Sequence, residues 1–297
     1  MIVVAGESLI DLVPQHPEDP LGPLWPRPGG GPYNTAVALG RLGSGAAFCS
    51  RVSTDGFGEA LLGGLAAAGV DTSLVQRGPE PTTLAVAALG PDGSAGYGFH
   101  ADGTADRLFE LPPQLPPRAT ALALGTCSLI LEPGATAYEA LLRRESVRGL
   151  LTLLDPNIRP ALIPDPDAYR ARFRSWLPYV SLLKLSEEDA AWLGGTVEEW
   201  LREGPRAVVM TRGAAGLSVH TARGAEHVVP AERVEVADTI GAGDTVNAAL
   251  LHHVRTRSAL DAADWPYVLR YAAKAAALTC TKEGAQPPTS EELASVS

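Results

Sequence analysis

A glycine-rich loop leads into a helix in the stretch Ala237-Asp238-Thr239-Ile240-Gly241-Ala242-Gly243-Asp244-Thr245-Val246-Asn247. Small residues let the backbone approach a ligand closely. The free N–H groups and the dipole at a helix start favour an anion, most often a phosphate. Asp244 stands out, because its carboxylate would repel that anion. It either caps the helix, as aspartate often does, or serves as a base that takes a proton from a hydroxyl attacking a phosphate.

The length of the segment that matches a known family favours the role of Asp244 as a base. Residues 238–245 resemble the C-terminal signature of the ribokinase-like (PfkB) carbohydrate kinases. The resemblance implies that the catalytic base is Asp244 and that a potassium ion can bind at Asp238. It also implies an anion hole that contacts ATP, made by Gly241, Ala242 and Gly243.

Composition and charge narrow the possible functions. The chain has 297 residues, of which 45% are hydrophobic and 20% are charged, and its formal net charge is −10. This is enough for one large α/β domain spanning residues 1–297. The acidic balance argues against a nucleic acid or a membrane surface as partner.

The cysteines and the first residues bear on location. Cys49, Cys127 and Cys280 are odd in number and far apart, which indicates a reducing compartment. Residues 1–6 are apolar but lack a basic segment, so they read as a buried strand and not as a signal peptide. We therefore expect a cytoplasmic enzyme.

Two segments near the N-terminus carry candidate sugar ligands. Asp11 follows the end of the first predicted strand, where open α/β sheets bind ligands. It either accepts hydrogen bonds from two sugar hydroxyls or stabilises a turn. Residues 29–31 are three glycines before a helical pattern, and the family has a similar sugar-gripping motif that Gly30, Gly31 and Asn34 match.

Two strand-like runs surround Pro91-Asp92-Gly93, which is a hairpin signal. In the resembling family a small β-sheet lid covers the sugar and often pairs between two subunits. We place the lid segments at about 11–28 and 82–106 and expect a homodimer through them. Phe99 is either a sugar-facing residue or part of the hairpin core.

Acid, amide and guanidinium side chains follow another buried strand at Asp155-Pro156-Asn157-Ile158-Arg159-Pro160. The planar fork of Arg159 suits the oxygens of a transferring phosphate. The segment resembles one found in fructokinases and related sugar kinases. This favours a substrate-binding role for Asn157, a catalytic role for Arg159 and a structural role for Asp155.

The expected ATP side comes from the C-terminal half. Lys184 ends a strand, and the next helix begins with Ser186 as N-cap and Asp189 in a capping-box position. The family has an asparagine at position 184 and a glutamate that orders Mg²⁺ through water, which Glu187 matches. A family turn that contacts the nucleotide phosphates is matched by Thr211, Gly213 and Gly216, although such turns also occur as plain hairpins.

The alternation of strands and helices predicts a doubly wound, mostly parallel sheet flanked by helices. The implied activity is an ATP- and Mg²⁺-dependent sugar kinase, with D-fructose as the favoured substrate and fructose 6-phosphate as product. A kinase for 2-keto-3-deoxygluconate or another sugar is the alternative, although residues 82–106 contain no Arg or Lys to bind an acid. A catalytically silent sugar-binding sensor is the hypothesis from another class.

Overall fold

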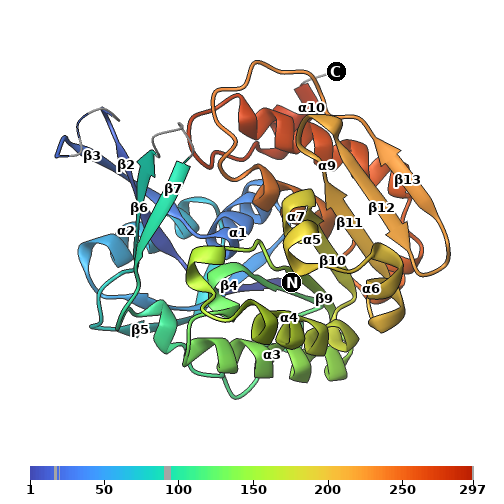
Figure 1. Ribbon diagram of the computed structural model, residues 1–297, viewed down its shortest axis with the longest axis horizontal. Coiled ribbons are helices and arrows are strands. Elements are labelled where there is room, and N and C mark those ends of the chain that lie inside the picture. Colours follow the sequence, from blue (N-terminus) through green and yellow to red (C-terminus); the bar gives the residue numbers. More distant parts are fainter. Residues whose placement is uncertain (17–18, 20, 90–94, 296–297) are drawn as a thin grey trace.

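A nine-stranded sheet is the centre of the computed structural model, which describes residues 1–16, 19, 21–89 and 95–295 (Figure 1). The strands from one edge to the other are β13 (Glu226–Val229), β12 (Leu217–Thr221), β11 (Ala207–Thr211), β10 (Leu182–Ser186), β9 (Leu151–Asp155), β8 (Ala121–Gly125), β1 (Ile2–Ala5), β4 (Ala46–Ser53) and β5 (Asp71–Gly78). All neighbours are parallel except β11–β12 and β12–β13, which are antiparallel. The expected doubly wound, mostly parallel sheet is confirmed.

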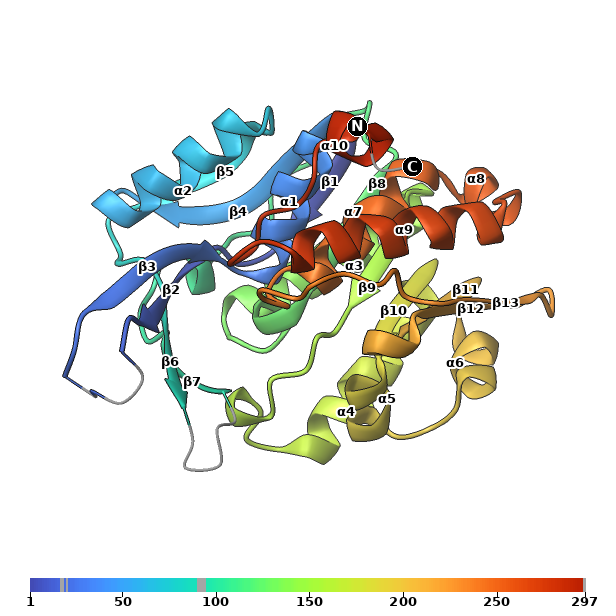
Figure 2. The ribbon, with the colours of Figure 1, turned by 90° about the horizontal axis from the view of Figure 1, so that it is seen from above.

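The sheet is buried on both faces, which explains its continuous apolar strands. One face packs against α1 (Gly31–Arg41), α2 (Gly56–Ala67), α7 (Ala242–His253), α8 (Arg257–Asp261), α9 (Trp265–Cys280) and α10 (Ser290–Ser295). The other face packs against α3 (Gly134–Arg148), α4 (Pro166–Trp176), α5 (Glu187–Leu193) and α6 (Val197–Glu203). Figure 2 shows the resulting layers, with α7 and α9 on one side of the sheet and α4 and α6 on the other.

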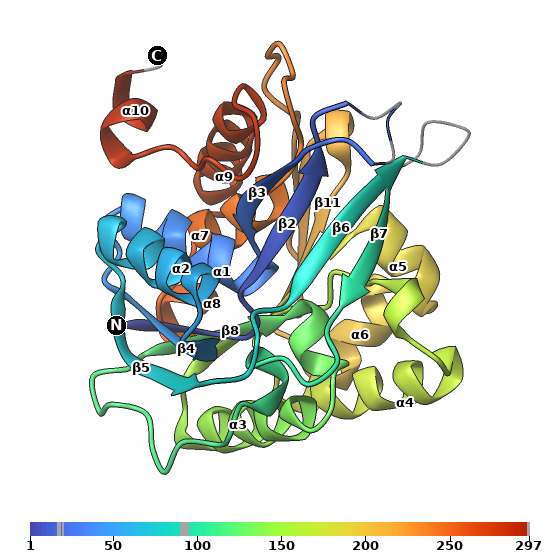
Figure 3. The same ribbon diagram turned by 90° about the vertical axis from the view of Figure 1, so that its left-hand side faces the viewer.

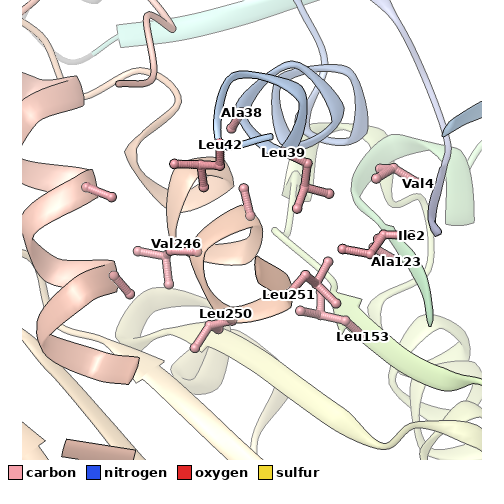
Figure 4. Close-up of a cluster of buried hydrophobic side chains, with 14 of the residues drawn as sticks. Ile2, Val4, Ala38, Leu39, Leu42, Ala123, Leu153, Val246, Leu250 and Leu251 are labelled. Atoms are coloured by element: carbon pink, nitrogen blue, oxygen red, sulfur yellow. The ribbon is translucent and has the colours of Figure 1, made fainter. Parts of the chain in front are cut away.

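Alternate residues of each strand enter opposite cores. In β1, Ile2 and Val4 point toward α1 and α7, whereas Val3 and Ala5 belong to the other cluster. Figure 4 shows Leu251 of α7 beside these residues. Each fully buried leucine of this kind contributes roughly 1.5–3 kcal/mol through the area it removes from water. The core thus holds the N-terminus of α7 rigidly above one edge of the sheet.

A second, four-stranded sheet stands beside the main body (Figure 3). Its order is β3 (Leu24–Gly29), β2 (Leu9–Pro14), β6 (Leu84–Leu89) and β7 (Ala95–His100). The β6 and β7 strands pair antiparallel, with Ala85 opposite Phe99. The turn predicted at Asp92-Gly93 lies outside the described residues. We call this second sheet the small sheet.

Short connections complete the chain. Five 3₁₀ turns occur among the described residues, at η1 (Asp106–Leu108), η2 (Thr126–Leu129), η3 (Pro160–Leu162), η4 (Leu177–Tyr179) and η5 (Gly213–Ala215). The apolar alternation of Val234 and Val236 forms no strand; these side chains are exposed in the loop before α7. No helix in the described part of the chain is long and apolar enough to cross a membrane.

Candidate active site

The site lies where the chain reverses its direction across the sheet. From β1 the chain first adds β4 and β5 on one side, and it later adds β8 and its successors on the other. Open α/β sheets bind ligands beyond the carboxyl ends of the strands at such a switch point. A cavity of about 240 Å³ is found there, lined by Glu7, Leu9, Asp11, Gly30, Gly31, Asn34, Tyr97, Phe99, Thr126, Cys127, Asn157, Arg159, Lys184, Thr239, Ile240, Gly241, Gly243 and Asp244.

The N-terminus of α7 opens toward this cavity. Gly241 precedes the helix with φ +78°, and a Cβ there would lie 2.6 Å from the Cβ of Ala285, so only glycine fits. The N–H of Ala242 donates to the carbonyl of Thr239 at 3.3 Å. No acceptor for the N–H groups of Gly243 and Asp244 occurs among the described residues. The N–H groups of Gly243 and Asp244 are therefore open donors at the start of α7, whereas the N–H of Ala242 is already engaged.

Asp244 is buried in the first turn of the helix and forms part of the cavity wall. Asn34 of α1 donates from Nδ2 to Asp244 Oδ2 at 2.9 Å. Burial raises the pKa of Asp244 from 3.8 to about 7, and the charge of Asp155 adds to the rise, while Asn34, Lys184 and Arg159 oppose it. A carboxylate with a pKa near neutrality is well matched to general-base catalysis.

The glycines before α1 allow three segments to meet. A Cβ on Gly31 would lie 2.6 Å from Thr126 Cγ2 and 3.2 Å from Asp244 Oδ1. Gly30 has φ +102°, and a Cβ there would approach the carbonyl of Glu7 to 2.9 Å. The backbone at positions 30–31 therefore forms one wall of the cavity beside the carboxylate of Asp244.

The small sheet supplies the opposite wall. Asp11 of β2 lies against Gly29 of β3, where a Cβ would come within 2.1 Å of Asp11 Oδ2. Burial raises the pKa of Asp11 to about 6, although the charge of Arg159 lowers it. Tyr97 and Phe99 of β7 lie on the same cavity, with ring centroids 6.3 Å apart. Phe99 thus faces the cavity, which favours the first of its two predicted roles.

Arg159 and Asn157 form one unit in the loop after β9. Arg159 Nη1 donates to Asn157 Oδ1 at 2.7 Å and to the carbonyls of Asn157 and Ile158 at 3.0 and 3.1 Å. Asn157 has φ +40°, a region that asparagine tolerates better than most residues. Asp189 of α5 accepts the N–H of Ile158 at 2.7 Å, so the predicted capping box, which is present, also anchors this loop.

Lys184 is buried, and it is one of the residues that line the cavity. Its Nζ donates to Asp155 Oδ2 at 2.9 Å, and a Cβ on Gly243 would lie 3.0 Å from the same Nζ. The ion pair with Asp155 raises the pKa of Lys184 despite the desolvation that opposes it. A cation is therefore fixed beside the open N–H groups of α7, and Asp155 holds it there.

The other predicted ATP and metal residues lie outside the lining of this cavity. Thr211 ends β11 beside Ser186, and Gly216 has a structural need of its own, because a Cβ there would lie 2.1 Å from the carbonyl of Val229. Gly213, in the 3₁₀ turn after β11, has φ +50°. Glu187 lies 3.7 Å from Arg212 in an ion pair.

Asp238 connects two loop segments through hydrogen bonds from the backbone. Its carboxylate accepts the N–H groups of Ile240 at 3.0 Å and Gly284 at 2.8 Å. Among the described residues, no cluster of three or more His, Cys, Asp or Glu side chains is arranged to hold a metal.

Several lining residues were not singled out from the sequence. Glu7 accepts hydrogen bonds from Thr126 Oγ1 and from the N–H of Ser128, and burial raises its pKa. Glu7 lies two residues past the end of β1 and Thr126 directly follows β8, so the strand-end rule used for Asp11 could have found them. Tyr97 could have been found from its alternation with Phe99.

Several known proteins are similar to this chain in sequence. The chain matches the description "pfkB family carbohydrate kinase" over residues 1–292. A fructokinase of Rhizobium leguminosarum bv. trifolii is 40% identical over 259 residues, covering 84% of this chain and 78% of that protein. Fructokinase-1 of Oryza sativa subsp. japonica is 34% identical, with coverage of 99% and 96%.

Solved structures agree in fold. Fructokinase from Xylella fastidiosa with bound ATP has a TM-score of 0.90 at 29% identity, covering 99% of this chain and 97% of that one. A fructokinase double mutant from Vibrio cholerae, solved with fructose, ADP and potassium ion, has a TM-score of 0.83 at 26% identity, with coverage of 99% and 96%. The family match over nearly the whole length, together with these likenesses, establishes that this chain belongs to the pfkB family of carbohydrate kinases.

Proposed function

We propose that this protein transfers the γ-phosphoryl group of ATP to the 6-hydroxyl of D-fructose. The observation that carries the proposal is the position of Asp244: its buried carboxylate and the open N–H groups of α7 adjoin one cavity. A base and an anion site within one helical turn are what phosphoryl transfer to a hydroxyl requires. The fructokinases among the relatives support fructose as the acceptor.

The chemistry follows from these groups. Asp244 takes the proton of the sugar hydroxyl while the hydroxyl oxygen forms a bond to the γ-phosphorus of ATP. The bond between that phosphorus and the bridging oxygen of ADP breaks, and ADP leaves. The N–H groups of Gly243 and Asp244 lie where charge collects on the transferring group, and the loss of one such donor costs on the order of 3 kcal/mol of barrier. Lys184 and Arg159 add positive charge on the same side. Asp244 then returns the proton to solvent when the products leave.

The sugar ligands are proposed from the opposite wall. Asp11 would accept hydrogen bonds from sugar hydroxyls, and Asn157, whose Nδ2 would lie 3.6 Å from a Cβ on Gly31, would donate to another hydroxyl. Phe99 covers an apolar face of the ring. Asn34 is already bonded to Asp244, so we propose that it orients the base as well as contacting the sugar.

The nucleotide and its metal are proposed on the α5 and β11 side. Thr211 and Gly213 would contact the ATP phosphates. Mg²⁺ keeps several water ligands and needs few protein carboxylates, so the exposed Glu187 suits a contact through water. When bound, that ion neutralises charge on the phosphates. Asp238 retains lone pairs for K⁺, which a related fructokinase binds.

The positive charges in the cavity matter for the alternative substrate, the acid 2-keto-3-deoxygluconate. The absence of Arg and Lys from residues 82–106 favoured a neutral sugar, but Arg159 reaches the cavity from another loop. Its Nη1 is engaged with backbone and amide oxygens, and Lys184 is paired with Asp155. Both cations are thus partly committed, and we keep fructose ahead of 2-keto-3-deoxygluconate.

We also propose a homodimer through the small sheet, which would act as the lid over the sugar. Leu24 and Trp25 of β3 expose 40% and 52% of their surface, and Leu21 exposes 95%. Large apolar side chains gathered on an edge strand suit a protein interface. The free thiols of Cys49, Cys127 and Cys280 are compatible with the proposed cytoplasmic location.

The test is coupled ADP release with purified protein, Mg²⁺-ATP and a panel of fructose, 2-keto-3-deoxygluconate, ribose, tagatose and adenosine. Turnover dominated by fructose is expected. Turnover with 2-keto-3-deoxygluconate would keep the fold and mechanism but change the substrate. Sugar binding without any ADP release would support the sensor alternative.

A further inference from the structure

A second, much smaller cavity lies directly behind Asp244. Its volume is about 10 Å³, and it is lined by Val4, Gly31, Pro32, Thr35, Ala123, Leu124, Gly125, Thr126, Leu153, Asp155, Asp244 and Asn247. Gly31, Thr126 and Asp244 also line the sugar cavity, so they form the wall between the two. A cavity of this size holds a single water molecule when enough polar partners surround it.

Two oxygens at this cavity lack a donor. Asp155 Oδ2 accepts from Lys184 at 2.9 Å and from Asn247 Nδ2 at 2.7 Å. Asp155 Oδ1 and Asn247 Oδ1 are both buried, and neither has a hydrogen-bond partner among the described residues. The amide of Asn247 cannot be reversed without losing its bond to Asp155 Oδ2. Two buried acceptors on residues that line this cavity therefore remain without a donor, which folded proteins rarely allow.

Any group that satisfies both oxygens must donate to two acceptors within a space of about 10 Å³. A water molecule does so with its two O–H groups. A monovalent cation would need several more oxygens, whereas Val4, Pro32, Ala123, Leu124 and Leu153 make most of the remaining wall apolar. The two acceptors and the apolar wall around them therefore fit a water and not an ion.

We propose that one ordered water binds behind Asp244, donating to Asp155 Oδ1 and Asn247 Oδ1, and that Asp155 and Asn247 are positioning residues for the base. Because both of its protons are donated to these two oxygens, the water presents only its lone pairs to Asp244. It accepts a hydrogen bond only when Asp244 is protonated, which is the state reached once the base has taken the sugar proton. Its part in catalysis rests on the proposed kinase function, but its presence does not.

The first test is a high-resolution crystal structure of the wild-type protein. We expect one density peak within about 3.0 Å of both bare oxygens. A cavity without density, or a peak that contacts neither oxygen, would overturn the proposal. A peak with five or more oxygen neighbours, or with the anomalous signal of a heavier ion, would also overturn it.

The second test fills the cavity with Ala123→Val. The matched control is Ala121→Val, two residues away on the same strand and in the same core cluster but not at the cavity. Thermal unfolding of both variants measures the common cost of overpacking, and a crystal structure of the Ala123→Val variant should lack the peak.

The charged and polar groups that face Asp244 are Asn34, Asp155, Lys184 and Arg159, and the substitutions leave all of them in place. We therefore expect the acidic limb of kcat/KM to move down by roughly half to one pH unit in the Ala123→Val variant alone. Equal profiles in the two variants would refute the link to the base. If the wild type phosphorylates no sugar, the proposed function fails while the density peak still decides the water.

Discussion

Replacing Asp244 with asparagine separates catalysis from stability. The change keeps the size of the side chain and an oxygen that can accept from Asn34 Nδ2, which now donates to Asp244 Oδ2 at 2.9 Å. It removes the group that takes the proton. General-base catalysis contributes roughly 10²–10⁴-fold to the rate, so we expect kcat to fall by about that factor while ATP binding is retained.

The same substitution should raise the stability of the folded protein although it lowers kcat. The pKa of Asp244 is raised from 3.8 to about 7 in the folded protein, mainly by burial. The folded state therefore holds a proton that the unfolded chain releases above pH 3.8, and the wild type loses stability as the pH rises from about 4 to 7. At 1.36 kcal/mol per unit, this amounts to roughly 4 kcal/mol at pH 8. Asparagine does not titrate, so Asp244→Asn should be more stable than the wild type by up to that amount.

The assays are urea unfolding at pH 4.5 and pH 8 and coupled ADP release with fructose. The variant should unfold at higher urea than the wild type at pH 8, and the two should converge at pH 4.5. Near-normal kcat would refute the base assignment. Equal or lower stability at pH 8 would refute the argument that burial of this carboxylate costs free energy.

Three further predictions follow from the same contacts. In the wild type, kcat/KM should rise about tenfold per pH unit up to a pKa near 7, because only ionised Asp244 accepts the proton, and a pH-rate profile without that limb would contradict this. Lys184→Met should destabilise the fold by roughly 3–5 kcal/mol, since it leaves Asp155 charged and unpaired. The double variant with Asp155→Asn should regain stability in urea but not activity, and activity in it would exclude the phosphate role of Lys184. Arg159→Lys should lower kcat/KM on the order of tenfold to a hundredfold, because an ammonium cannot bond Asn157 as Nη1 does and also offer the remaining guanidinium N–H groups to the phosphate, and unchanged kinetics would remove Arg159 from the site.

Much of the site could be predicted because its key residues are neighbours in sequence. Gly241, Gly243 and Asp244 lie at the N-cap and in the first turn of α7, so one short stretch of sequence carries them all. The strand-end rule likewise places Asn157 beyond the end of β9, whereas Asp11 lies within β2 of the small sheet and reaches the cavity from there.

Contacts between distant segments could not be predicted. The pair of Lys184 with Asp155 depends on β9 and β10 being neighbours, and the bond from Asn34 to Asp244 joins residues 210 positions apart. The two acceptors for the water proposed behind Asp244 were likewise invisible before the contact between Asn247 of α7 and Asp155 of β9 was known.

The most direct test of the account is the identity of the product made from Mg²⁺-ATP and fructose, determined by NMR of the isolated sugar phosphate. The account predicts fructose 6-phosphate in amounts equal to the ADP released. Phosphate on another carbon would contradict the proposed placement of the sugar, and ADP without any sugar phosphate would contradict the assignment of Asp244 as a base for a sugar hydroxyl.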